Sequence, residues 1–279
     1  MFKILEKTKL NDSVIKMVID APFIAKKADA GQFIIYRVDE CGERIPLTIS
    51  DFDREKGTIT IIFQTVGSST MSLASLEEGD SILDVTGPLG VATEYEPDIK
   101  RVAVVGGGVG CAIAYPQAKK LFNMGVEVDL IAGFRNKDIM ILEEEMKAAC
   151  TNLYMCTDDG SYGYHGFVTD RLHELIEEKG NYDEVIAIGP VPMMKFVCRV
   201  TEPYGIKTLV SLNPIMIDGT GMCGGCRVTV DGKIRYACVE GPDFDGHKVD
   251  FDELIIRNST YRDEEKRHVC RLRGGADNG

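Results

Sequence analysis

Short runs of β-branched and aromatic residues, separated by turn residues, dominate the first third of the chain. Three of these runs cover residues 14–19, 32–38 and 58–63, with Gly, Asp and Pro between them. Residues of these types favour strands, and several short strands at this spacing are typical of a small antiparallel barrel. We therefore predict that residues 1–97 form a β-barrel domain.

After Pro97 the pattern changes to short apolar strands that alternate with helical stretches. The predicted strands cover residues 102–105, 126–132, 152–156 and 185–188, and the predicted helices include residues 143–149 and 168–179. Strands that are apolar along their whole length are buried on both faces, and their alternation with helices indicates a doubly wound parallel sheet. We predict such an α/β domain over residues 98–212.

The regular alternation ends there, and residues 213–279 form a third predicted unit. It contains a Gly-rich stretch and three closely spaced cysteines, and residues 227–230 and 233–236 flank Asp231-Gly232, which predicts a β-hairpin with a primed turn. The predicted fold class is therefore α+β and multidomain. It combines an antiparallel β-barrel domain, an α/β doubly wound domain and a small C-terminal module.

Composition and charge narrow the functional classes. The chain has 279 residues, of which 44% are hydrophobic and 27% charged, and a net charge of −12, as in an ordinary globular protein. This acidity argues against a nucleic-acid partner, since phosphate binding needs a clustered basic surface. The N-terminus lacks the apolar core of a signal peptide, and no apolar run approaches the ~18 residues of a membrane-spanning helix. We expect a cytoplasmic protein without a membrane partner.

A glycine-rich turn follows the first predicted strand of the second domain. Gly106, Gly108, Val109 and Gly110 lie where an open α/β sheet offers its ligand crevice, and the following helix presents free N–H groups to a phosphate. The run departs from the full dinucleotide fingerprint, and a strand-to-helix turn without a ligand would also favour glycine. The motif by itself leaves both interpretations open.

Two further loops follow predicted parallel strands and would therefore face the same crevice. The candidate binding residues in these loops are Asp158, Asp159, Gly160 and Ser161 in the first and Gly189, Pro190 and Met193 in the second. Three convergent loops of small residues favour a nucleotide site over three independent turns. For Asp158 and Asp159 the competing interpretation is capping of a turn or helix.

Two single residues near these loops also have two interpretations each. Arg135, near the end of the second strand, could meet a 2′-phosphate or pair with Glu144, so the preference between NAD and NADP is not decided. Cys111 directly follows the glycine turn. We interpret it as a small buried residue at a helix start, and a place at a cofactor contact is the alternative.

An aspartate and three cysteines have the spacing of an iron–sulfur site. Asp218, Cys223, Cys226 and Cys238 fall at offsets of five, three and twelve. Plant-type [2Fe-2S] sites use C-x₄-C-x₂-C and a more distant cysteine, so Asp218 stands in the place of the first cysteine. An anionic carboxylate can replace a thiolate ligand, and the surrounding glycines suit a loop that wraps closely round a cluster. The alternative is structural zinc bound by the three cysteines and His247.

With these motifs in order, the chain resembles the ferredoxin-NADP reductase-like superfamily. Within it, the chain is similar to the electron-transfer subunits of dihydroorotate dehydrogenase, sulfide dehydrogenase and NADH-dependent reduced ferredoxin:NADP oxidoreductase. The resemblance covers nearly the whole chain. It rests on residues 44–49, 66–70, 87–90, the glycine turn, residues 158–161 and the segment 218–238.

The resemblance implies that the barrel binds FAD. Pro46, Leu47 and Thr48 would then border the isoalloxazine ring, while Gly67, Ser69 and Thr70 would face the diphosphate. The superfamily pattern is R-x-[YL]-[ST], but here Ile45 occupies the arginine position and Arg44 lies one residue early. The group that balances the phosphate charge is therefore left open.

The resemblance also implies a route for electrons. NADH would dock at the carboxyl edge of the sheet and pass a hydride to FAD, which would pass single electrons to the [2Fe-2S] cluster. Flavins can exchange one or two electrons, whereas nicotinamide is confined to two-electron steps. Such a reaction needs no catalytic acid, base or nucleophile, and we predict none, because positioning carries the catalysis.

The implied partner is a larger subunit with FAD and [4Fe-4S] clusters, through which ferredoxin and NADP would react, as in an electron-bifurcating enzyme. The aspartate at position 218 favours a likeness to the small subunits of the ferredoxin:NADP oxidoreductases over the dihydroorotate dehydrogenase subunits, which are expected to have four cysteines. The dihydroorotate dehydrogenase electron-transfer subunit remains the first alternative. A zinc-structured, nucleotide-sensing module is the alternative from another functional class.

Overall fold

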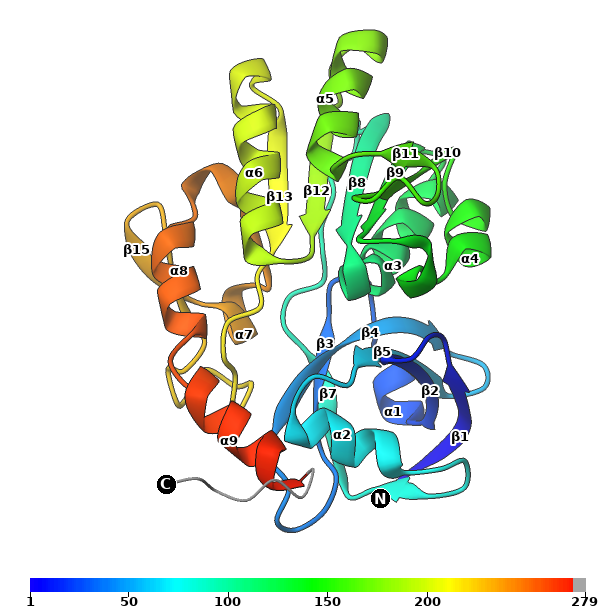
Figure 1. Cartoon of the computed structure of the whole chain (residues 1–279), viewed down its shortest axis with the longest axis vertical. Helices are drawn as coiled ribbons and strands as arrows, with labels where there is room; N and C mark the ends of the chain where they lie inside the picture. The colour runs from blue at the N-terminus through cyan, green and yellow to red at the C-terminus, as the bar shows by residue number, and fades with distance from the viewer. Residues whose placement is uncertain (273–279) are drawn as a thin grey trace.

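The computed structural model describes residues 1–272, so residues 273–279 of the predicted third module lie outside the described residues. Two sheets lie one above the other in Figure 1, and the C-terminal part of the chain runs alongside both. The lower sheet holds the seven strands β1 (Phe2–Lys9), β2 (Val14–Asp20), β3 (Phe33–Arg37), β4 (Ile45–Asp53), β5 (Thr58–Gln64), β6 (Ser81–Ile82) and β7 (Asp84–Leu89).

This lower sheet is the predicted antiparallel barrel. Its strand order is β6-β1-β2-β5-β4-β3-β7, and only Leu83 separates the two edge strands β6 and β7 along the chain, so the sheet curls almost into a closed cylinder. Apolar side chains such as Ile59, Ile61 and Phe63 of β5 fill its interior. Two short helices complete this part, α1 (Pro22–Ala25) and α2 (Ser68–Ser75).

The upper sheet is the predicted parallel sheet with one addition. Its order is β11-β10-β9-β8-β12-β13-β16, and every pairing is parallel except that of β16 with β13. The strands are β8 (Arg101–Gly107), β9 (Glu127–Phe134), β10 (Asn152–Thr157), β11 (Tyr164–His165), β12 (Glu184–Ile188), β13 (Lys207–Ser211) and β16 (Asp243–Asp245).

Helices cover both faces of this sheet, as a doubly wound fold requires. The helices α3 (Cys111–Asn123) and α4 (Glu143–Ala148) bury one set of apolar side chains, and α5 (Val168–Lys179) and α6 (Val191–Thr201) bury another on the opposite face. Three short 3₁₀ turns join these elements, η1 (Gly108–Gly110), η2 (Lys137–Ile139) and η3 (Glu202–Tyr204).

The C-terminal segment contains the predicted hairpin. The strands β14 (Arg227–Val230) and β15 (Lys233–Tyr236) are antiparallel, and the positive φ angles of Asp231 (53°) and Gly232 (68°) identify the predicted primed turn. The turn η4 (Gly246–Lys248) and the helices α7 (Ala237–Glu240), α8 (Phe251–Asn258) and α9 (Arg262–Leu272) follow.

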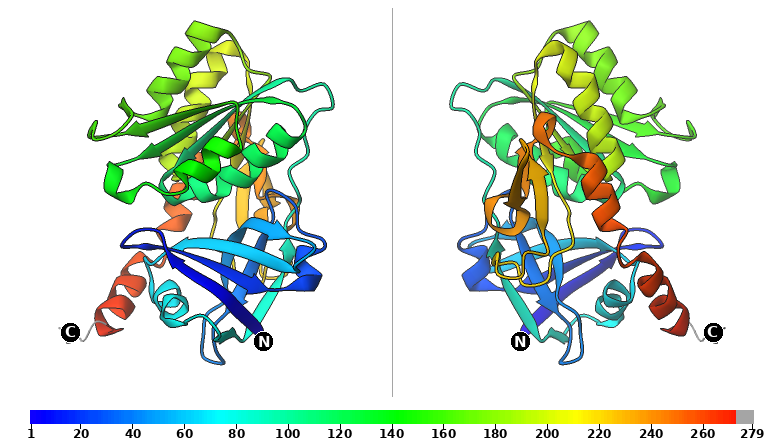
Figure 2. Two further views of the ribbon diagram at one scale, coloured as in Figure 1. Left: turned by 90° about the vertical axis from the view of Figure 1, so that its right-hand side faces the viewer. Right: turned by 90° about the vertical axis from the view of Figure 1, so that its left-hand side faces the viewer.

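The C-terminal segment is tied to both sheets. Its strand β16 pairs with β13 and extends the upper sheet, an addition that the sequence pattern does not predict. Both views of Figure 2 show the segment alongside the barrel and the upper sheet. The domain boundaries at 97/98 and 212/213 stay predictions.

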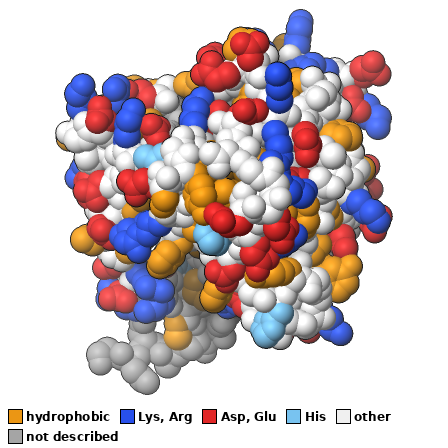
Figure 3. Space-filling view, turned by 90° about the horizontal axis from the view of Figure 1, so that it is seen from above, with side chains coloured by type: hydrophobic (Ala, Val, Ile, Leu, Met, Phe, Trp, Pro, Cys, Tyr) orange, Lys and Arg blue, Asp and Glu red, His pale blue; other side chains and the backbone are white. Residues whose placement is uncertain are grey.

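Over the face seen in Figure 3, acidic and basic side chains are interspersed. Within residues 1–272, no helix combines the length and the apolar character needed to cross a membrane.

Candidate functional site

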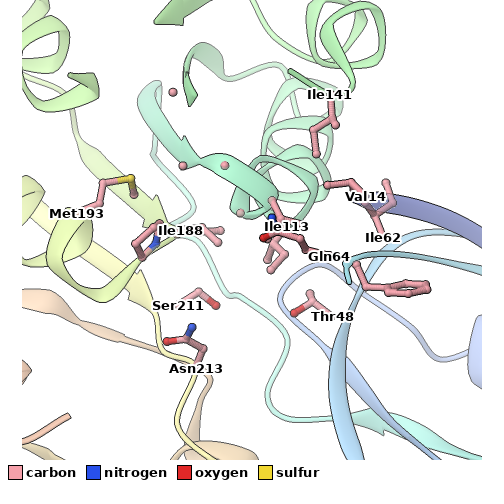
Figure 4. Close-up of a pocket in the computed structure, with 18 of the residues that line it drawn as sticks. Val14, Thr48, Ile62, Gln64, Ile113, Ile141, Ile188, Met193, Ser211 and Asn213 are labelled. Carbon is pink, nitrogen blue, oxygen red and sulfur yellow. The ribbon is translucent and has the colours of Figure 1, made fainter. Parts of the chain in front are cut away.

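A cavity of about 1170 Å³ lies between the barrel and the carboxyl edge of the upper sheet. Strands β4 and β5 form one wall, and the loops that follow β8, β9, β10, β12 and β13 form the other. Figure 4 shows side chains from both sides directed into this space, among them Thr48 from the barrel and Ser211 from the sheet. Ligands of open α/β sheets bind at this edge, and the volume exceeds the roughly 300–1,000 Å³ of typical small-molecule sites.

The barrel wall contains most of the residues predicted for FAD. Pro46, Leu47, Thr48 and Thr70 line the cavity. Two predicted residues, Gly67 and Ser69, are not among the lining residues. The Gly67 N–H donates to Thr70 Oγ1 at 3.1 Å at the start of α2, and the Ser69 hydroxyl donates to the Glu43 carboxylate. The structure therefore places Gly67 and Ser69 next to the cavity wall, at the amino-terminal end of a helix.

Arg44 contacts the C-terminal segment of the chain. Its Nε donates to the carbonyl oxygen of Ile217 at 3.1 Å, so it contacts the segment that leads to Asp218. The arginine that lies one residue early thus joins the barrel to the cysteine segment.

The glycine turn reaches the cavity through Gly108, Val109 and Gly110. The predicted Gly106 does not line it, whereas its neighbour Gly107 does. A Cβ on Gly106 would lie 3.0 Å from the Cα of Cys111, so glycine is needed there to let α3 approach the strand. Gly108 has a φ of +57° and open space around it, which suits close approach of a ligand.

Cys111 itself is fully buried at the start of α3 and is not a lining residue. Burial raises the pKa of its thiol to about 12, so the group is neutral. The interpretation as a small buried residue is therefore the one that the structure supports.

The two other predicted loops are divided between the cavity and local structure. Asp158, Gly189, Pro190 and Met193 line the cavity. The other three predicted residues form a turn beside it: the Ser161 N–H donates to Asp159 Oδ1 at 2.9 Å, and Gly160 has a φ of +71°. The hydrogen bonds from Ser161 lower the pKa of Asp159. For Asp159, turn capping is the role that the structure shows.

Several lining residues were not predicted, and some of them had a readable signal. Ser211 is the last residue of the parallel strand β13 and Asn213 lies just after it, at the same carboxyl edge as the predicted loops, so their position could have been inferred. Arg135 lines the cavity as well. Phe33 could not have been inferred from the pattern, because its contact with the cavity depends on how the barrel packs against the C-terminal segment.

The three cysteines lie on the loop before the hairpin and on α7. The sulfurs of Cys226 and Cys238 are 3.1 Å apart and buried, while Cys223 is exposed. Backbone N–H groups point at two of the sulfurs: that of Gly225 at Cys223 Sγ (3.4 Å) and that of Cys238 at Cys226 Sγ (3.5 Å). Such donors stabilise anionic sulfur, as iron–sulfur sites require.

Asp218 lies at the entrance of the same loop as an ionised group. Its carboxylate accepts the N–H groups of Thr220 and Cys223, each at 3.0 Å, and these bonds lower its pKa, with the Thr220 bond the largest cause. Gly219 follows with a φ of +77°, and a Cβ there would lie 2.7 Å from side-chain atoms of Ile35 and Leu89. Glycine therefore lets the loop lie directly on the barrel.

His247 is engaged elsewhere. Its Nε2 lies 3.0 Å from the carbonyl oxygen of Ile206, next to Thr201 at 3.5 Å. Within the described part of the chain, no three His, Cys, Asp or Glu side chains converge on a single metal position. A tetrahedral zinc site needs four convergent ligands, whereas a [2Fe-2S] cluster is bound by two ligands on each of two irons.

The cysteines and the cavity share one set of packed side chains. Phe33 of β3 and Met216 line the cavity, and both pack in a buried cluster with Cys226 and Cys238. A ligand in the cavity and a cluster on the cysteines would thus both border the same buried group of side chains.

Comparison with known proteins agrees with this arrangement. Residues 213–250 match the iron-sulfur cluster binding domain of dihydroorotate dehydrogenase B, and residues 104–199 match an oxidoreductase NAD-binding domain. The chain is 53% identical over 272 residues to an uncharacterized protein of Clostridium beijerinckii, covering 95% of this chain and 92% of that protein. It is 46% identical over 264 residues to a Thermotoga maritima homologue of the dihydroorotate dehydrogenase B (NAD(+)) electron transfer subunit, covering 95% and 93%.

The chain belongs to the family of dihydroorotate dehydrogenase B electron-transfer subunits and their homologues. A solved structure of NADH-dependent reduced ferredoxin-NADP oxidoreductase, from work on flavin-based electron bifurcation, superposes on it with a TM-score of 0.92 at 43% identity and covers 98% of both chains. A solved ferredoxin-NADP+ reductase of Plasmodium falciparum and a solved cytochrome P450 reductase of Amycolatopsis share the fold at 14% and 21% identity, with TM-scores of 0.58 and 0.63; this chain is covered to 72% in both comparisons, and those chains to 90% and 65%.

As a member of this family, the chain is an electron-transfer oxidoreductase subunit that uses FAD, NAD(H) and a [2Fe-2S] cluster. Its residues fit these groups. The cavity joins the barrel wall to the glycine turn, and the loop from Asp218 to Cys226 combines an ionised carboxylate, thiols and inward N–H groups. The zinc alternative is therefore not supported.

Proposed function

We propose that this electron-transfer subunit passes electrons from NAD(H) through FAD to a [2Fe-2S] cluster and on to a larger partner flavoprotein. The observation that carries the proposal is the packing of Phe33 and Met216 between the cavity and the buried Cys226 and Cys238. FAD supplies the step from hydride transfer to single-electron transfer. The chain supplies the positions, since the cavity walls come from the barrel and from the sheet edge.

The proposed FAD residues are those predicted from the sequence, with Pro46, Leu47 and Thr48 on the cavity wall and Gly67, Ser69 and Thr70 at the start of α2. The amino-terminal end of a helix with small polar residues favours a diphosphate. The nucleotide would use Gly106, Gly108, Val109, Gly110, Asp158, Asp159, Gly160, Ser161, Gly189, Pro190 and Met193, of which Gly106, Asp159, Gly160 and Ser161 do not line the cavity.

We propose Asp218, Cys223, Cys226 and Cys238 as the cluster ligands. The test is anaerobic purification of the chain with its co-purifying partner, followed by iron, sulfide and FAD analysis and by visible and EPR spectra. Asp218→Asn is the informative variant, because Asn can still accept the N–H groups of Thr220 and Cys223 but lacks the anionic oxygen. We expect Asp218→Asn to lose or shift the cluster spectrum and Asp218→Cys to give the spectrum of a four-cysteine site.

Two results would contradict these assignments. Iron-free protein that contains zinc would remove the cluster and the electron route with it. An unchanged cluster spectrum in Asp218→Asn would show that this carboxylate only shapes the loop, and the fourth ligand would have to be another residue.

The proposed partner is a larger subunit with FAD and [4Fe-4S] clusters, through which ferredoxin and NADP react, as the likeness to the ferredoxin-NADP oxidoreductase suggests. The competing candidate is a dihydroorotate dehydrogenase, because the named curated relatives carry that name. Both share the internal chemistry of this chain. Identifying the protein that co-purifies with the chain distinguishes the two candidates. So do two assays of the complex, one for oxidation of dihydroorotate and one for reduction of NADP.

A further inference from the structure

A carboxyl group lies buried directly behind the cavity, where the three parts of the chain meet. Asp243 of β16 is the cross-strand partner of Ser211 in β13, and Ser211 lines the cavity. Asp243 Oδ2 accepts hydrogen bonds from the Thr93 hydroxyl and, at 3.2 Å, from Gln117 Nε2 of α3. Asp243 Oδ1 is buried and has no hydrogen-bond partner within residues 1–272.

The neighbours of Asp243 fix the orientation of its carboxyl group. Gln117 Nε2 also donates to Thr93 Oγ1 at 2.6 Å, and Gln117 Oε1 accepts the hydroxyl of Tyr95. Both donors act on the same oxygen of Asp243, which leaves Oδ1 as the free acceptor. A buried acceptor without a donor destabilises the fold, so its presence in a fixed position needs a reason.

The reaction of the proposed function supplies a reason, and the inference rests on that function. A hydride from NADH brings two electrons and one proton to the flavin site. The cluster accepts electrons but no protons, so one proton must leave the flavin site for each NADH that is oxidised. The cavity is walled by protein on both sides, and a positioned acceptor would speed this step.

We propose that Ser211 and Asp243 remove this proton from the cavity. Ser211 Oγ takes the proton on the cavity side while its own hydroxyl proton passes to Asp243 Oδ1. An O–H bond of Ser211 breaks as an O–H bond forms on Asp243, and the incoming proton gives Ser211 a new O–H bond. The two electrons leave separately to the cluster. Asp243 acts through Ser211 and does not itself line the cavity.

The surroundings of Asp243 suit a proton acceptor. Burial raises the pKa of Asp243, while the hydroxyls of Thr93 and Ser211 and the Gln117 amide oppose this increase. A base with a raised pKa is more effective near neutral pH. The charged and titratable groups on the elements around it are Asp29, Tyr95, Glu96, Lys120, Glu184 and Lys207. Lys120 pairs with Asp29 at 3.0 Å, and Lys207 pairs with Glu184 at 3.1 Å and with Glu96 at 3.5 Å, so each lysine offsets carboxylate charge near Asp243.

The test uses the holoprotein with its partner and the variants Asp243→Asn and Ser211→Ala. Asn at 243 can still accept from Thr93 and Gln117 but cannot take up a proton. Glu184→Gln is the matched control, because Glu184 is also a buried acid with a raised pKa, but its cross-strand partner in β13, Lys207, does not line the cavity. Anaerobic stopped-flow mixing with NADH separates flavin bleaching from the later absorbance change of the cluster.

In Asp243→Asn we expect flavin bleaching within about twofold of the wild type and cluster reduction slower by about a hundredfold, the low end of general acid–base effects. Ser211→Ala should slow cluster reduction by a similar factor. The wild-type rate of cluster reduction should rise with pH through the pKa of Asp243, since only the carboxylate accepts a proton. This rise should vanish in Asp243→Asn and persist in Glu184→Gln.

A second measurement needs no turnover. Spectroelectrochemical titration gives the flavin midpoint potential against pH, and its slope should change at the pKa of Asp243 in the wild type and lose this change in Asp243→Asn. An unaltered slope change and unaltered rates in that variant would overturn the proposal. An equal slowing of both kinetic phases would do so too, because it would indicate a purely structural role. Failure of the proposed function itself would look different, since NADH would then not bleach the flavin of the wild type.

Discussion

Replacing Asp129 with alanine would remove the centre of a buried polar cluster at the amino-terminal edge of the upper sheet. The side chain of Asp129 is fully buried on β9. Its carboxylate accepts hydrogen bonds from the Tyr182 hydroxyl and from Asn152 Nδ2, each at 2.7 Å. It also pairs with Arg101 and Lys179, each at 3.3 Å. The cluster joins three strands of the sheet to α5.

The loss in the free energy of unfolding follows from the groups that lose their partner when Asp129 is replaced. Arg101 is only 15% exposed and would lose its buried counter-charge, and the Tyr182 hydroxyl would lose its acceptor. Breaking a buried ion pair by removing one partner costs about 3–5 kcal/mol. Arg101 keeps its stacking on the Tyr182 ring, at 4.1 Å, so we expect a loss of about 3 kcal/mol in the free energy of unfolding.

Denaturant unfolding followed by far-UV circular dichroism measures this loss. The matched control is Glu127→Ala, which removes the other acidic partner of the same arginine from the same strand. Glu127 is 48% exposed and 3.7 Å from Arg101, so this change should cost no more than about 1 kcal/mol. Equal losses in the two variants, or a loss below about 1 kcal/mol in Asp129→Ala, would refute the reasoning.

The pH dependence of this difference has a definite sign. Burial alone would raise the pKa of Asp129, but the hydrogen bonds from Tyr182 and Asn152 and the charge of Lys179 outweigh it, and the pKa is lowered. A lowered pKa stabilises the fold above the unfolded-state value of about 3.9, and this contribution is lost as the pH falls through the folded-state value. The advantage of the wild type over Asp129→Ala should therefore be complete at neutral pH and shrink in acid.

Two further predictions concern the glycine turn and the thiols. A Cβ at Gly110 would lie 2.5 Å from the carbonyl oxygen of Ile188, so Gly110→Ala should cost about 1–3 kcal/mol of stability and weaken NADH binding in titration calorimetry. Gly108→Ala meets no atom and should cost only the left-handed backbone strain of about 1–2 kcal/mol, so a larger loss there than at Gly110 would contradict this account. In native protein, a thiol reagent should modify the exposed Cys41 within minutes and leave the buried Cys111, with its pKa of about 12, unmodified until unfolding, as mass spectrometry of the labelled peptides would show.

Much of the local structure could be predicted from the sequence. The runs at 14–19, 58–63 and 102–105 became β2, β5 and β8, and Asp231-Gly232 became the primed turn of the hairpin. These elements are set by local physics, namely the propensity of β-branched residues for strands and the backbone freedom of glycine. Four of the eight residues of strand β1 are charged, without strict alternation, and the strand was not predicted, because pairing with β2 and β6 is what holds it in the sheet.

The candidate site divides in the same way. The sequence by itself determined which loops follow parallel strands, hence that the glycine turn, Asp158 and Gly189 approach one edge, and it determined the spacing of Asp218 and the cysteines. Only the tertiary structure decided that Arg44 faces Ile217, that Phe33 and Met216 lie between the cavity and the cysteines, and that β16 brings Asp243 beside Ser211. The physical reason is that periodicity and turn chemistry act over a few residues, whereas these contacts join segments that are far apart in the chain and are selected by packing.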